Sequence, residues 1–127
     1  MTRYFWETQG GRMCLALAFS ATDFTFDCAG PTAAERGHQP ELRALFGPGA
    51  DLSASFYPAF RIGHGNLISL TLGGKPVKAE WIRRLGPQVG GGDAYFVPLS
   101  HWPRSERLSA KVAVNGRQKT LSMNVDL

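Results

Sequence analysis

The two cysteines are the residues whose chemistry the sequence constrains most closely. Cys14 lies in an apolar run over residues 13–19, and Cys28 ends a second run over residues 24–28. If these runs form an antiparallel hairpin with a loop over residues 20–22, Cys14 and Cys28 face each other. Facing strand positions lie about 4.5–5.5 Å apart at Cα, within reach of a disulfide. We therefore predict a Cys14–Cys28 disulfide, with two buried free thiols as the alternative.

Tryptophans beside arginines form the second group with chemical potential. They occur in residues 81–84 and 102–107, both in the second half of the chain. Trp and Arg are favoured at the centres of protein interfaces, and aromatic rings among basic residues also suit single-stranded nucleic acid. The alternative for Trp81 is a place in the core, on one face with Val77 and Ala79. The predicted partner-binding residues are Trp81, Arg83, Arg84, Trp102, Arg104 and Arg107.

The sequence contains no motif of a metal site, a nucleophilic enzyme or a phosphate-binding loop. The histidines His38, His64 and His101 lack the spacing of zinc ligands, and no Gly-x-Ser-x-Gly nucleophile turn or phosphate-binding glycine motif occurs. We therefore predict no metal, no cofactor and no enzymatic activity. The rival from the enzyme class is a small hydrolase that combines His64 or His101 with a carboxylate such as Asp93 and a serine.

Charge is divided unevenly along the 127 residues. Residues 1–60 carry four basic and six acidic side chains (net −2), whereas residues 61–127 carry ten basic and four acidic side chains (net +6). A basic half can steer acidic partners toward the protein, although a charged surface also serves solubility alone. No apolar run reaches the roughly 20 residues of a membrane span, so we expect no transmembrane segment. The first residues lack a secretory pattern, which leaves a cytoplasmic protein or one whose signal peptide has been removed.

The elements that must position these residues are mainly short strands. Gly and Pro number 15 and 8, which favours turns over long helices. We predict an all-β fold over one domain (residues 1–127), an antiparallel sandwich or barrel of about seven or eight strands. One short helix follows the first hairpin: Pro and Gly at its ends favour a helix over residues 40–47, and residues 32–36 can form one helical turn.

Turn residues and apolar alternation set the expected registers. We expect a strand over residues 52–56, which Pro58 limits to a sheet edge or ends, a flexible loop over 85–93, and a further strand over 94–99. In the first hairpin the predicted facing pairs are Ala18 with Phe24 and Ala16 with Phe26. Around Gly73-Gly74 they are Leu70 with Val77 and Ile68 with Ala79. Around Asn115-Gly116 they are Val114 with Arg117, Ala110 with Leu121, and Leu108 with Met123.

Two stretches resemble known families. The strand over residues 68–74, the segment 95–99 and the final hairpin 111–127 follow one another in an order that resembles the periplasmic invasion-associated locus B family, over residues 66–127. Residues 26–29, 34–36 and 40–45 look like the opening of LprI-type lysozyme inhibitors. Both resemblances imply a secreted, non-catalytic protein and transfer no functional residue.

Together these observations predict a non-catalytic binding module of the bacterial cell envelope, periplasmic or secreted. Its basic second half would engage an acidic protein or an anionic envelope component. Two alternatives are an enzyme-inhibiting protein similar to lysozyme inhibitors and a cytoplasmic module that binds nucleic acid or regulates another protein.

Overall fold

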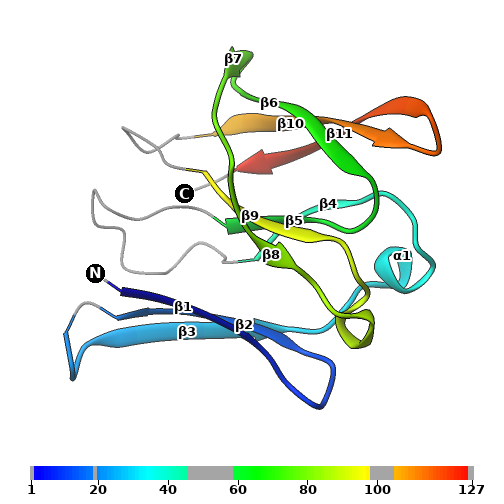
Figure 1. Cartoon of the computed structure of the whole chain (residues 1–127). Helices are drawn as coiled ribbons and strands as arrows, with labels where there is room; N and C mark the ends of the chain where they lie inside the picture. Colours follow the sequence, from blue (N-terminus) through cyan, green and yellow to red (C-terminus); the bar gives the residue numbers. More distant parts are fainter. Residues whose placement is uncertain (1, 19, 46–58, 98–104, 126–127) are drawn as a thin grey trace.

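The part of the chain that the structure describes forms three antiparallel β-sheets that lie one above another (Figure 1). The computed structural model describes residues 2–18, 20–45, 59–97 and 105–125. The lower sheet has the order β1 (Thr2–Glu7), β2 (Met13–Ala18), β3 (Phe24–Ala29); the middle sheet β4 (Leu42–Ala44), β5 (Ala59–Ile62), β9 (Asp93–Phe96), β8 (Glu80–Arg84); and the upper sheet β11 (Arg117–Val125), β10 (Glu106–Val114), β6 (Asn66–Leu72), β7 (Lys75–Pro76).

The predicted all-β class is confirmed, with more strands than expected. The described residues form eleven strands, one α-helical turn, α1 (Ala33–Arg36), and one 3₁₀ turn, η1 (Pro87–Val89). Strands β4 and β7 are only three and two residues long. Such short segments carry too little alternation to be recognised in a sequence.

Two hydrophobic cores separate the three sheets. Met13 and Leu15 of the lower sheet pack against Ala59 and Ala94 of the middle sheet. The other face of the middle sheet packs against the upper sheet through a second cluster. That cluster contains Leu42, Phe60, Ile62, Leu70, Leu72, Val97, Leu108, Ala110, Val112 and Val114. Because the middle sheet is covered on both faces, all four residues of β5 are buried.

The first and last hairpins confirm the predicted registers. Cys14 pairs with Cys28, and their sulfurs form a disulfide with a Cα–Cα distance of 4.1 Å. Asn115 and Gly116 both have positive φ, as a type I′ turn requires. The other predicted pairs are also present: Ala18 with Phe24, Ala16 with Phe26, Val114 with Arg117, Ala110 with Leu121, and Leu108 with Met123.

The predicted helix over residues 40–47 is wrong within its described part, residues 40–45. Leu42–Ala44 form strand β4, which pairs with β5. An isolated helix of about two turns is marginal in water, so pairing with an exposed sheet edge wins over local propensity. The helical turn predicted over residues 32–36 is present as α1, where Thr32 and Glu35 form a capping box.

The hairpin around Gly73-Gly74 forms only in part. The Val77 amide donates to the Leu70 carbonyl at 3.0 Å, in the predicted register, but β7 ends at Pro76. Ile68 is therefore not opposite Ala79. It is instead the extra residue of a β-bulge, because Lys111 pairs with Ser69 and Val112 pairs with Leu67. The bulge turns Ile68 outward, and its side chain is 50% exposed.

Candidate functional site

The structure separates the predicted partner-binding residues. Trp81, Arg83 and Arg84 lie on β8 of the middle sheet, and Arg107 lies on β10 of the upper sheet. Trp102 and Arg104 lie outside the described residues, as do His101, the strand predicted over residues 52–56 and the end of that predicted over 94–99.

Trp81 lies on the surface and not in the core. Its side chain is 61% exposed, and its indole Nε1–H donates to Asp93 Oδ1 at 2.9 Å. Arg84 approaches the other carboxylate oxygen, Asp93 Oδ2, at 3.6 Å. The alternative that places Trp81 in the core is therefore wrong. Val77 and Ala79 pack against the upper core, but the chain then crosses to β8 at the edge of the middle sheet.

Arg83 holds two sheets together. Its guanidinium contacts Glu7 Oε2 of β1 at 3.0 Å and lies 5.9 Å from the centre of the Phe5 ring. Glu7 Oε1 also accepts a hydrogen bond of 2.6 Å from the Gly86 amide. These contacts fasten the lower sheet to the middle sheet, so we assign Arg83 a structural role.

A polar face covers the outer side of the upper sheet, and we call it the hydroxyl face. It is composed of the outward residues of β6, β10 and β11, which are Asn66, Ile68 at the bulge, Ser69, Thr71, Arg107, Ser109, Lys111, Ala113, Gln118, Thr120, Ser122 and Asn124. Arg107 and Lys111 are exposed on it. Among these residues there is no carboxylate. The face therefore presents hydroxyl and amide groups around two cations, a surface that favours an anion.

The strands of the upper sheet also concentrate positive charge. They carry Lys75, Arg107, Lys111, Arg117 and Lys119 against a single carboxylate, Glu106, which is five cations minus one anion, or +4. The strands of the lower sheet carry one cation, Arg3, against two carboxylates, Glu7 and Asp27, a net charge of −1. Five of the ten cations of residues 61–127 thus lie on the strands of this one sheet.

A polar recess of about 350 Å³ lies where the upper and middle sheets meet. His64, Asn66, Arg84, Asp93 and Asn115 line it, so it joins the hydroxyl face to the predicted residue Arg84. His64 and Asp93 share this recess, as a hydrolase would require. However, its described lining contains no serine or cysteine, and Asp93 already binds Trp81.

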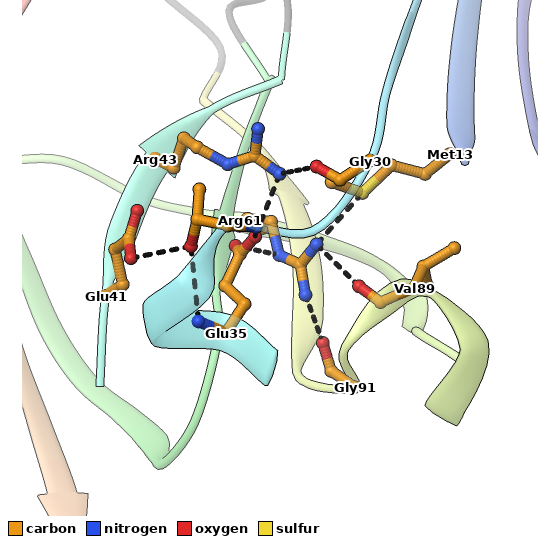
Figure 2. A network of polar contacts seen from close by, with 9 residues as sticks. Met13, Gly30, Glu35, Glu41, Arg43, Arg61, Val89 and Gly91 are labelled. Carbon is orange, nitrogen blue, oxygen red and sulfur yellow. Dashed lines mark hydrogen bonds and ion pairs between the residues drawn. The ribbon is translucent and has the colours of Figure 1, made fainter. Parts of the chain in front are cut away.

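A buried ionic network holds the loop that leads into the recess (Figure 2). Arg61 of β5 contacts Glu35 of α1 at 2.6 Å between Nε and Oε2, and both side chains are fully buried. Arg61 also donates to the Val89 carbonyl at 3.0 Å and to the Gly91 carbonyl. These bonds fix the segment before Asp93. Within residues 85–93, predicted to be a flexible loop, the structure has the 3₁₀ turn η1 and a glycine segment bonded to Arg61.

The same network continues to strand β4. Arg43 contacts Glu35 Oε1 at 2.9 Å and donates to the Gly30 carbonyl at 3.0 Å. Burial lowers the pKa of Arg61, and the neighbouring carboxylate of Glu35 opposes that shift. Glu35 therefore supplies the charge that a buried guanidinium needs. The sequence carries no sign of this pairing, because residues 35 and 61 are far apart along the chain.

The comparisons with protein-family models, curated proteins and solved structures find no match to this chain. The two resemblances described above therefore remain predictions. Within the described ranges, no helix is long and apolar enough to cross a membrane. In the same part of the chain, no group of three His, Cys, Asp or Glu side chains could hold a metal ion.

Proposed function

We propose that this protein is a binding module of the bacterial cell envelope that engages an extended anionic envelope component through the hydroxyl face. The observation that carries the proposal is the position of Arg107 and Lys111 on a sheet face without a carboxylate. Hydrogen bonds to charged groups contribute about 1.5–3 kcal/mol each, more than bonds between neutral groups. Neighbouring hydroxyls would bind the remaining oxygens of a phosphate, sulfate or carboxylate.

The shape of this surface supports a polymer over a compact anion. The hydroxyl face spans three neighbouring strands, and its polar residues repeat along β10 and β11 at every second position. Ser109 and Ser122 lie close together, with 3.1 Å between their Oγ atoms. A series of such groups suits a ligand that repeats its own charges along its length.

The cysteines support the envelope location. Both are used in one disulfide, and disulfides persist mainly in oxidising compartments such as the periplasm. Mass spectrometry of protein purified from its native host tests this part. A mass two hydrogens below that of the reduced chain is the expected result, and free thiols would contradict it.

Binding measurements test the surface. Heparin serves as the probe of an extended anionic glycan, with single-stranded DNA and an acidic peptide as competing probes. We expect the double variant Arg107→Ser/Lys111→Ser to bind heparin about tenfold or more weakly, as loss of two charge-assisted contacts implies.

The matched control is Arg117→Ser/Lys119→Ser, which removes the same charge from exposed positions that pair with the core residues Val114 and Val112 and therefore lie off the hydroxyl face. It should retain affinity within about threefold, the effect of net charge alone. Equal losses in the two variants would mean nonspecific attraction and would overturn the proposed surface. Stronger binding of DNA or of the acidic peptide would replace the glycan with that class of partner.

A further inference from the structure

The lower sheet has an outer face that takes no part in either core. Its cross-strand rows are Trp6 with Cys14 and Cys28, Tyr4 with Ala16 and Phe26, and Thr2 with Ala18 and Phe24. Met13 and Leu15 point to the opposite side and are buried in the lower core. We call this outer surface the aromatic face.

On the aromatic face the small side chains lie on the central strand and the large ones on the two outer strands. The central strand β2 contributes Cys14 and Ala16, which are nearly covered. The outer strands β1 and β3 contribute aromatic rings at their edges. Those rings are exposed to 55% for Tyr4, 38% for Trp6, 57% for Phe24 and 60% for Phe26. Four exposed rings on one sheet face are unusual for a surface without a partner.

The rings of Phe24 and Phe26 are neighbours along β3. Their centres lie 6.3 Å apart, and their planes differ by 22°. The spacing results from two positions of one strand whose side chains point to the same side. Two nearly parallel rings in series can stack on two successive flat units of an extended ligand.

The absence of charge limits the class of ligand. None of the nine residues of the aromatic face is charged, and the strands of the lower sheet have a net charge of −1. An anionic membrane surface attracts clusters of Lys and Arg, which this face does not offer. An uncharged partner therefore fits it better.

The size of the surface argues against a second copy of the chain. Aromatic side chains bury about 150–250 Å² each, so four half-exposed rings offer roughly 400 Å². A stable protein interface needs about 800 Å² from each partner. The face is thus too small for a dimer and suits a narrow ligand.

We infer that the aromatic face binds an uncharged glycan chain, with Phe24 and Phe26 stacking on successive sugar rings. The face of a pyranose ring that carries its C–H groups is apolar and packs on aromatic rings, while its hydroxyls stay in water. Tyr4 and Trp6, on β1 at the other edge of the face, contact the same glycan chain. This site is separate from the hydroxyl face and does not depend on the function proposed for it.

Titration with soluble oligomers of N-acetylglucosamine and of glucose tests the inference, with tryptophan emission, to which Trp6 contributes, and heat of binding as two readouts. The full chain should bind at least one series, and Phe24→Ala/Phe26→Ala should weaken binding about tenfold or more, because two apolar contacts are lost. Phe24→Tyr/Phe26→Tyr keeps both rings and should retain the affinity. Ile68→Ala, at an exposed apolar position in the upper sheet, is the matched control and should bind normally.

Several outcomes would overturn the inference. The first is that the full chain binds neither oligomer series. The second is that the Phe24→Ala/Phe26→Ala variant binds with unchanged affinity. The third is that the full chain binds neutral phosphatidylcholine vesicles, or self-associates, and that this variant loses that property. If the alanine variant does not fold, the decision rests on whether the tyrosine variant and the full chain bind. Heparin binding through Arg107 and Lys111 is measured separately, so failure of one site is distinguishable from failure of the other.

Discussion

Arg61 and Glu35 form a fully buried ion pair between the middle sheet and α1, with 2.6 Å between Nε and Oε2. Two charges inside a small β protein require complete compensation, since the transfer of each from water is costly. Arg61 obtains it from Glu35 and from backbone carbonyls of the loop before Asp93. The pair therefore connects the packing of the interior to the shape of the recess.

Glu35→Ala should destabilise the protein strongly. It would leave the buried guanidinium of Arg61 without a counter-charge, a change that costs about 3–5 kcal/mol. Urea unfolding measures the free energy of unfolding directly. Arg36→Ala, at the exposed neighbouring position on α1, is the control and should change it by less than about 0.5 kcal/mol. Similar small effects of both substitutions would contradict the role assigned to Glu35.

Removal of the disulfide should reduce stability moderately. The linked cysteines are 14 positions apart, and closing a loop of that length stabilises a protein by about 3 kcal/mol in the chain-entropy description. Cys14→Ala/Cys28→Ala should therefore unfold at lower urea concentration than the oxidised protein. The untouched protein in excess reductant provides the control, and it should lose a similar amount. A variant as stable as the oxidised protein would show that the hairpin does not need its covalent link.

The salt dependence of heparin binding should report the cations of the hydroxyl face. Each phosphate- or sulfate-binding cation contributes to counterion release, so Arg107→Ser/Lys111→Ser should lower the slope of log affinity against log salt by about one to two. Titrations at several salt concentrations give the slope. A slope that falls equally in Arg117→Ser/Lys119→Ser would indicate attraction by overall charge.

Tyr95 should lower the stability of the protein at alkaline pH. Burial raises the pKa of its phenol, with a further increase from Asp93 and an opposing effect of Arg84. The unfolded chain releases the phenol proton near pH 10, whereas the folded protein releases it at a higher pH. The contribution of the protonated phenol to stability is therefore complete below about pH 10 and is lost as pH rises through the folded pKa. Unfolding measured across alkaline pH should show this loss, and Tyr95→Phe should reduce it. Tyr4→Phe, which removes an exposed phenol, is the comparison variant, and an equal effect of the two substitutions would contradict the role assigned to the burial of Tyr95.

Local sequence determined the features that depend on neighbouring residues. The register that brings Cys14 to Cys28, and the turn at Asn115-Gly116, follow from alternation of side chains and from turn chemistry within one hairpin. These features can be predicted because both strands and their turn lie within about thirty residues of sequence.

Tertiary structure alone decided the features that depend on distant strands. Leu42 became part of a strand because β5 offered it a partner, and Ile68 turned outward because β10 pairs with β6 through a bulge. Trp81 became exposed when its strand joined the middle sheet as an edge. In each case the decisive hydrogen-bond partner is a strand from another part of the chain. The periodicity of a single segment does not indicate which distant strand it will pair with.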